Sequence, residues 1–247
     1  MQVDVVDLKS FYASPLGQMA RAMVLRAIRA RWESLNGLAL MGLGYGVPYL
    51  DALRDGTERT LAFMPARQGV VAWPPGQLSS ASLIEPTDLP LRDAVMDRIL
   101  VVHALEVSDD PSALMSELWR VLAPGGHVMM IVPNRRGPWA RADTTPFGHG
   151  QPYSRGQLTA LLRQALFTPT HWAEALFAPP LGRGFMLRAA PAWERLGTAL
   201  SLPFAGVHVI EATKQVYRPA VTGKAQRVRG LLPELLVPTG TVTGRRP

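Results

Sequence analysis

The sequence predicts an α/β protein whose doubly wound, mostly parallel sheet carries helices on both faces. Two observations support this fold class. Short apolar runs typical of buried strands alternate with segments of helical period, and the first such run enters a glycine-rich turn that opens a helix. In sheets of this kind ligands bind outside the carboxyl ends of the strands, where the winding direction reverses. We therefore expect a ligand site at the sheet edge that holds the glycine turn.

The first half of the chain opens with an expected amphipathic helix. Apolar residues from Leu16 to Leu35 recur at steps of three and four, and Asn36-Gly37 is expected to end the helix. The elements expected after it are a strand over 38–41, a helix over 47–53, a strand over 61–63 and an irregular crossover between 65 and 86.

The second half contains two helix starts with clear capping signals. Asp110 is a cap residue, and Pro111 stands at the first helical position, where its missing N–H costs little. Ser154 and Gln157 have the spacing of a capping box, which predicts a helix over 155–165. The other expected elements are strands over 97–102, 128–132, 171–177 and 207–216 and a helix over 186–200.

Composition excludes several classes of protein. The 247 residues are 47% hydrophobic and 18% charged, which indicates a soluble globular chain. The absence of cysteine excludes disulfides, cysteine-bound metals and thiol nucleophiles, and the histidines lack ligand spacing, so no metal site is expected. The first residues carry acid before base, and no apolar stretch approaches the roughly 20 residues that span a bilayer, so we expect a cytoplasmic protein without a membrane segment.

Most of the net charge of +7 lies near the carboxyl terminus. Residues 218–247 hold six basic residues and one acidic residue, together with several prolines and glycines. We therefore expect a single domain over 1–217 followed by a basic, flexible tail over 218–247. Because the tail lacks aromatic residues, a solubilising role is favoured over an RNA-binding arm, although an RNA-associated enzyme is kept as a third hypothesis.

The glycine turn is the first candidate binding element. Gly42, Gly44 and Gly46 remove three side chains where a strand turns into a helix, so backbone N–H groups can approach a ligand near the positive end of that helix. A dinucleotide fingerprint would place a glycine at Val47 and an acid about 20 residues further on, where residues 61–64 offer none. Nicotinamide binding is therefore disfavoured.

Four segments in this order resemble the class I S-adenosylmethionine-dependent methyltransferases, in particular those that act on small molecules. The segments are Gly42-Leu-Gly-Tyr-Gly46, Glu85-Pro-Thr-Asp-Leu-Pro90, Asp97 to Val102 and Arg120-Val-Leu-Ala-Pro-Gly-Gly126. The resemblance covers about residues 38–132, and the stretch from 133 to 154 looks like a divergent bacterial subgroup. It implies a Rossmann-like methyltransferase fold, S-adenosylmethionine as cofactor and a small-molecule acceptor rather than nucleic acid or a membrane.

The resemblance also implies roles for single residues. Gly42, Gly44 and Gly46 would face the methionine part of the cofactor, and Glu85, with Pro86 beside it, would lie near the adenine amine. Two acids usual in the family fall at Leu40 and Met64, and the second of these normally holds the ribose hydroxyls. Two hypotheses therefore stay open: methyl transfer to a small molecule, and a catalytically inactive protein that keeps the fold as a binding or assembly module.

His103 is the candidate catalytic residue. It follows the strand over 97–102, as does Glu106, at the edge where this family often places groups on the acceptor side. An imidazole titrates near neutral pH and could accept a proton from an acceptor that carries one. The alternative is a histidine with a structural hydrogen bond.

The segment 134–153 is a long loop rich in Arg, Trp and Gly and is a candidate substrate loop. Guanidinium groups recognise carboxylate or phosphate, and aromatic rings cover flat apolar ligands, so we expect a lid for an anionic or aromatic acceptor. The alternative is a structural loop whose Trp and Phe fill the core. The candidate residues are Arg135, Trp139, Phe147, His149 and Tyr153.

Overall fold

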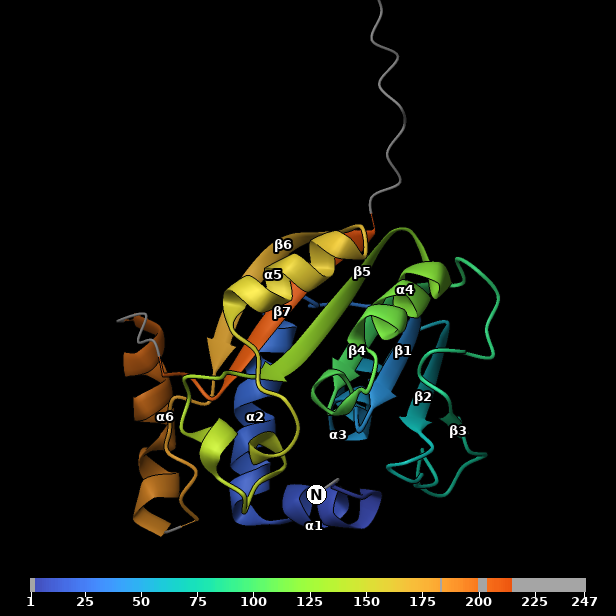
Figure 1. The fold of residues 1–247 in the computed structure, drawn as a ribbon. Coiled ribbons are helices and arrows are strands. Elements are labelled where there is room, and N and C mark those ends of the chain that lie inside the picture. Colours follow the sequence, from blue (N-terminus) through green and yellow to red (C-terminus); the bar gives the residue numbers. More distant parts are fainter. Residues whose placement is uncertain (1–2, 183, 200–203, 215–247) are drawn as a thin grey trace, which may run out of the picture. The chain divides into compact units, whose positions relative to one another are not determined.

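A computed structural model describes residues 3–182, 184–199 and 204–214, and in this part of the chain one sheet has the strand order β3-β2-β1-β4-β5-β7-β6. Strands β1 to β5 run parallel to one another, whereas β7 is antiparallel to both β5 and β6 (Figure 1). The predicted doubly wound, mostly parallel sheet is thus confirmed. The strands are β1 (Ala39–Gly44), β2 (Arg59–Pro65), β3 (Ala81–Ile84), β4 (Met96–Val102), β5 (Leu122–Pro133), β6 (Phe167–Ala175) and β7 (Val207–Lys214).

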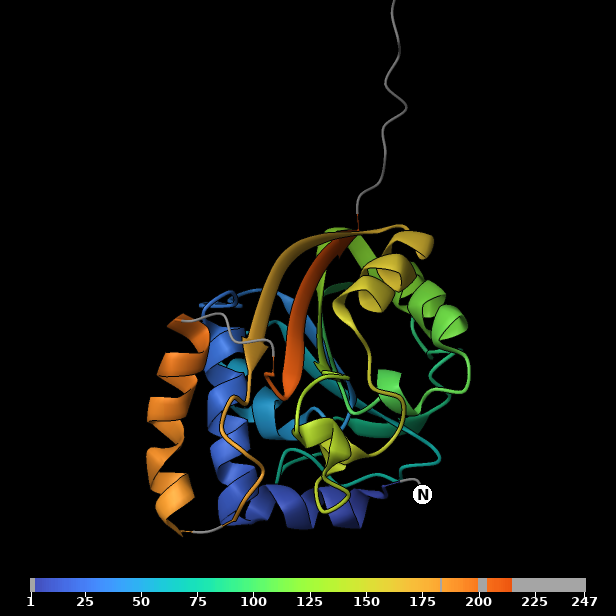
Figure 2. The same cartoon turned by 60° about the vertical axis from the view of Figure 1, so that its left-hand side comes forward.

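Helices cover both faces because neighbouring strand residues point to opposite sides of the sheet. Leu40, Leu100 and Val209 pack in one apolar cluster with side chains of α1, α2 and α3, whereas Met41 and Val101 pack in a second with side chains of α4 and α5. In both views α6 runs beside α2 (Figures 1 and 2). The helices are α1 (Val5–Ala13), α2 (Pro15–Arg29), α3 (Val47–Leu53), α4 (Pro111–Val121), α5 (Arg155–Gln164) and α6 (Gly184–Ala199).

Helix starts follow the expected capping chemistry. The side chain of Asp110 accepts a hydrogen bond from the N–H of Ala113 at the start of α4, where Pro111 is the first helical residue. Ser154 and Gln157 form the reciprocal capping box at the start of α5. The two predicted helix starts are therefore confirmed.

The structure differs from the sequence prediction at the first helix. Helix α1 was not predicted, because among its nine residues only Leu8 and Tyr12 are buried, which gives almost no helical period. Asp4 begins it by accepting hydrogen bonds from the N–H groups of Val6 and Asp7. Helix α2 ends at Arg29 rather than near Leu35, and the later apolar residues of the pattern, Trp32 and Leu35, are buried from the irregular segment that follows the helix.

Two strands also differ from the sequence prediction. The expected irregular crossover contains β3, which pairs with β2 through Ala81 and its successors. Strand β5 begins at Leu122, ahead of the Pro124-Gly125-Gly126 turn that was expected to separate α4 from the strand. The predicted tail over 218–247 lies outside the described residues. Among the described residues, no helix has both the length and the apolar character needed to cross a bilayer.

A buried carboxylate on β7 ties the N-terminal helical region to the sheet. Glu211 is 2% exposed and accepts hydrogen bonds from Arg31 Nε at 3.0 Å and Trp32 Nε1 at 2.9 Å, and its Oε1 lies 3.0 Å from His127 Nδ1 on β5. Burial alone would raise the pKa of Glu211, but the hydrogen bonds from His127, Trp32 and Arg31 outweigh it and lower the pKa to about 2.

We expect the Glu211→Gln variant to be about 2 kcal/mol less stable than the wild type at pH 7, because hydrogen bonds to a charged group are lost. The pKa of Glu211 is lowered by folding, so its contribution is complete above the unfolded value of 4.5 and is lost as the pH falls towards 2. Urea unfolding at several pH values should therefore show that the difference in unfolding free energy between the wild type and Glu211→Gln becomes smaller below pH 4.5. The exposed Glu58→Gln is the control, and an equal effect of both variants would contradict the assignment.

Candidate functional site

The glycine turn lies at the carboxyl end of β1 and is fully buried. Gly44 has φ +84°, and a Cβ atom placed there would lie 2.1 Å from the carbonyl oxygen of Val102 on β4. A Cβ atom at Gly42 would lie 2.7 Å from Leu50 on α3, whereas one at Gly46 would lie 3.5 Å from the Cα of Gly42. Two of the three glycines therefore already have a structural reason, the close approach of β1 to β4 and to α3.

Helix α1 crosses the edge at which the parallel strands end (Figure 1). Its residue Tyr12 stacks on Tyr45 of the glycine turn, with ring centroids 5.7 Å apart and 28° between the planes. The Tyr12 hydroxyl lies 3.1 Å from the Tyr49 hydroxyl and 2.9 Å from His103 Nε2. Tyr12 thus covers the glycine turn and joins it to the end of β4.

The three phenols of this cluster stay neutral at physiological pH. Burial raises the pKa of Tyr12 well above its usual value, and the neighbouring hydroxyl of Tyr49 raises it further. Burial likewise raises the pKa of Tyr45 to about 12, and it raises the pKa of Tyr49 well above the usual tyrosine value. The hydroxyl of Tyr12 therefore keeps its proton and can donate it in a hydrogen bond.

His103 is held in one orientation by partners on both ring nitrogens. It follows β4 with φ +55°, and its Nδ1 lies 3.1 Å from Glu106 Oε1 within the 3₁₀ turn Leu105–Val107. If Nδ1–H donates to this carboxylate, Nε2 accepts the proton of the Tyr12 hydroxyl. In a general base, a buried carboxylate often orients an imidazole towards a hydroxyl group. Glu106 and His103 have this arrangement, and the hydroxyl group is that of Tyr12.

Two buried acceptor atoms near His103 lack a donor among the described residues. They are Glu106 Oε2 and Gln68 Oε1. The amide nitrogen of Gln68 donates to the carbonyl oxygen of His103, which fixes the side chain against the end of β4. Buried acceptors without donors are costly, so this edge can take hydroxyl or N–H groups from a ligand.

Glu85 and Pro86 line a separate pocket of about 190 Å³ beyond the ends of β2 and β4. The Glu85 carboxylate accepts a hydrogen bond from the Thr87 hydroxyl at 3.3 Å and is otherwise exposed. Arg67 and Asp109 form an exposed ion pair and also line this pocket. Leu40 and Met64, where the resemblance would place acids, are buried in the apolar cluster on the α2 face.

The loop over 134–153 places its aromatic side chains inside the protein. Trp139 is buried and donates from Nε1 to the carbonyl oxygen of Ala178 at 2.7 Å. Phe147 is buried with its ring centroid 4.8 Å from that of His103, and Tyr153 is buried in the cluster on the α4 face. Arg135 is exposed. Of the predicted loop residues, the structure thus brings Phe147 to His103.

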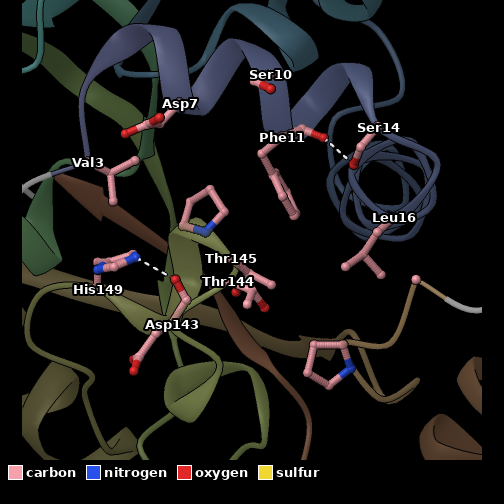
Figure 3. Close-up of a pocket in the computed structure, with 13 residues that line it drawn as sticks. Val3, Asp7, Ser10, Phe11, Ser14, Leu16, Asp143, Thr144, Thr145 and His149 are labelled. Carbon is pink, nitrogen blue, oxygen red and sulfur yellow. Dashed lines mark hydrogen bonds between the residues drawn. The ribbon is translucent and has the colours of Figure 1, made fainter.

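A pocket of about 550 Å³ lies between α1 and this loop (Figure 3). Phe11, Thr145 and His149 line it, and His149 Nε2 is 2.9 Å from the carbonyl oxygen of Asp143. The ring of Phe11 packs edge to face on Phe147 at 6.1 Å and on Tyr12 at 5.2 Å. These aromatic rings therefore stand between the pocket and His103.

Sequence reasoning missed Tyr12 and Gln68. Tyr12 could have been found only by recognising α1, whose apolar pattern is weak. Gln68 lies in the segment treated as irregular crossover, three residues beyond β2, and nothing in its neighbours marks it as buried. In the described residues, no group of three His, Asp or Glu side chains could hold a metal ion.

Comparison with known proteins finds sequences that are similar to part of this chain. Residues 42–130 match the protein-family model described as "Methyltransferase domain", a range from the glycine turn to β5. A protein of Mycolicibacterium smegmatis described as "Probable S-adenosylmethionine-dependent methyltransferase" is 33% identical over 134 residues. The match covers 51% of this chain and 49% of that protein, so this chain spans about half the length of the curated relative.

Solved structures share the fold at low sequence identity. A SAM-dependent methyltransferase from Thermotoga maritima superposes with a TM-score of 0.59 at 18% identity, over 85% of this chain and 96% of that one. The geranyl diphosphate C-methyltransferase of Streptomyces coelicolor, solved with S-adenosyl-L-homocysteine, gives a TM-score of 0.53 at 14% identity, over 77% of this chain and 75% of that one. At these identities the likeness concerns the fold.

We expect the Gly44→Ala variant to lose about 3 kcal/mol of stability, because the added Cβ atom meets the Val102 carbonyl oxygen and the backbone has positive φ. Gly46→Ala is the matched control, since its Cβ atom makes ordinary contact at negative φ, and it should lose less than about 1 kcal/mol. Urea unfolding measures both. Equal losses would show that the approach of β1 to β4 does not require Gly44.

Proposed function

We propose that this chain binds S-adenosylmethionine at the carboxyl edge of its sheet and methylates a small molecule, because residues 42–130 match the family model described as "Methyltransferase domain". The observation that carries the proposal is the family match itself, which spans the glycine turn, the Glu85 pocket and His103. The sheet order and the antiparallel β7 support it through the likeness to solved methyltransferases.

The polar groups of the edge fit such a cofactor in part. Glu85 and Pro86 line the pocket in which the adenine would lie, and its open volume suits a flat ring. Gln68 donates from Nε2 to the carbonyl oxygen of His103 after β4, and its Oε1, which has no donor among the described residues, would offer an acceptor for a ribose hydroxyl in place of the acid that Met64 replaces. The part over the glycine turn does not fit as the structure stands, because Tyr12 fills it.

Binding therefore requires α1 to move. Moving it breaks the contacts of the Tyr12 hydroxyl with Tyr49 and His103 and a backbone hydrogen bond from Val5 to Gln68. When the binding-competent state is a minor population, the apparent dissociation constant rises by the inverse of that fraction. The Tyr12 ring would thus weaken cofactor binding while the sheet keeps its structure.

The proposed chemistry of the chain is to hold an acceptor and to take its proton. The cofactor supplies an activated methyl group when bound. His103 would accept the proton at Nε2, Glu106 would hold the imidazole by Nδ1, and Phe147 would pack against its ring. The pocket behind Phe11 and Phe147 gives the acceptor a path to this position once α1 has moved.

A second candidate function is a non-catalytic binding module. Leu40 and Met64 favour it, since the usual acids are replaced by core residues, and the covered glycine turn favours it as well. The two functions differ in whether the edge opens to the cofactor.

Calorimetric titration with S-adenosylmethionine and S-adenosylhomocysteine distinguishes them. We expect Tyr12→Ala to bind at least tenfold more tightly than the wild type, because the ring that fills the site is gone. Tyr12→Phe keeps the ring but loses the hydroxyl contacts that hold α1, so it should bind more tightly than the wild type and less tightly than Tyr12→Ala. The exposed α1 variant Lys9→Ala is the control and should bind within a few-fold of the wild type. A folded Tyr12→Ala protein that binds neither compound at millimolar concentration would establish the non-catalytic module.

We expect His103→Gln to lower methyl transfer by about 10²- to 10⁴-fold for an acceptor that carries a proton, because the general base is lost. Transfer would be measured with methyl-labelled cofactor against a panel of phenols, amines and thiols. Because His103 also contacts the Tyr12 hydroxyl, transfer is measured at saturating cofactor, which separates the loss of the base from a change in cofactor binding. Full activity of the variant towards such an acceptor would remove His103 from the catalytic machinery.

A further inference from the structure

A second pocket, of about 360 Å³, lies on the α5 face of the sheet, where β5 ends and α5 begins. It is lined by Arg136 after β5, by Arg155 and Gly156 of α5, by Glu174 of β6 and by His208 of β7. The strand register places His208 beside Val132 of β5 and Glu174 of β6. Its neighbours Val207 and Val209 pack on the opposite face of the sheet. None of these residues belongs to the edge beneath α1.

His208 is buried without a hydrogen bond. It is 4% exposed, and neither ring nitrogen has a hydrogen-bond partner among the described residues. The carboxylate of Glu174 faces it, with Oε1 3.4 Å from Nδ1. A buried imidazole normally finds partners for its ring nitrogens, so a group within the pocket is expected to pair with His208.

The first turn of α5 points free donors at the same pocket. The N–H of Gln157 is taken by the cap residue Ser154, whereas no described residue accepts from the N–H groups of Arg155 and Gly156. A Cβ atom at Gly156 would have no heavy atom within 4 Å, so the space over this turn is open. Free N–H groups and the helix dipole together favour an anion there.

The charged side chains around the pocket add to this preference. Arg155 lies over the ring of Trp172 at 4.7 Å, which holds the guanidinium in place. In the part of the chain that the structure describes, neither Arg136 nor Arg155 forms an ion pair, although Arg31, Arg67 and Arg120 do. The single carboxylate among the lining residues, Glu174, leaves a positive balance at the pocket.

We propose that this pocket binds the phosphoryl group of a small phosphorylated molecule. The N–H groups of Arg155 and Gly156 and the two guanidinium groups would donate to the phosphoryl oxygens, and His208 would donate from Nε2 while Nδ1 faces Glu174. The pocket volume lies in the range of small-ligand sites, so there is room for an organic body attached to the phosphoryl group. This inference does not depend on methyl transfer.

The test is NMR titration of the full chain with inorganic phosphate, with acetate and chloride at equal ionic strength as comparison anions. The His208 imidazole signals are assigned from their loss in His208→Gln. We expect phosphate to shift them to saturation, and we expect acetate and chloride to act more weakly. Arg155→Gln and Arg136→Gln should each weaken phosphate binding about tenfold, since each removes a charge-assisted contact.

Arg163→Gln is the matched control. Arg163 is exposed at the other end of α5, and its substitution changes the net charge by the same amount. It should leave phosphate binding unchanged. An equal loss with Arg163→Gln, or a response to phosphate no larger than that to chloride, would overturn the site. If acetate bound more tightly than phosphate, the proposal of a phosphoryl ligand would be wrong and the result would indicate a carboxylate ligand.

Discussion

The hydroxyl of Tyr12 joins the parts of this protein on which its chemistry depends. It lies within hydrogen-bond distance of Tyr49 on α3 and of His103 beyond β4, so one phenol connects α1, the glycine turn and the acid–imidazole pair. Because burial raises the pKa of that phenol well above its usual value, the hydroxyl keeps its proton and the connection is a hydrogen bond rather than an ion pair. The state of the site is thereby tied to the position of a short helix.

Helix α1 is suited to such a role because few residues hold it. Of its nine residues Leu8 and Tyr12 are buried, Val5 and Phe11 pack partly buried against the same core, and the Val5 N–H donates to the Gln68 carbonyl oxygen. Elements with few buried apolar contacts open at lower free energy than the core of the same protein. The sheet beneath has no such freedom, since Gly44 allows β1 to approach β4 with no space for a side chain. A movable cover over a rigid edge follows from this difference in burial.

The parts of the fold that could be predicted are those whose physics is local. Asp110, Pro111 and the Ser154–Gln157 box mark helix starts with their own hydrogen bonds, and alternating strands and helices give the sheet. Helix α1 and strand β3 could not be predicted, because both are short and owe their conformation to contacts with distant segments. The site shows the same division. His103 and Glu106 stand three residues apart and were found together, whereas Tyr12 comes from 91 residues away.

The antiparallel strand β7 explains why one edge of the sheet carries two regions of unpaired polar groups. It enters the sheet beside the end of β5, so its first residues lie level with the carboxyl ends of the parallel strands. Alternation along β7 sends Val207 and Val209 to the α2 face and His208 to the α5 face. The sheet itself separates the two regions. Among the described residues, the acceptors Gln68 Oε1 and Glu106 Oε2 lack a donor beneath α1, and the ring nitrogens of His208 lack a hydrogen bond on the α5 face. A ligand at one region therefore need not displace a ligand at the other, and any influence between them has to pass through the strands they share.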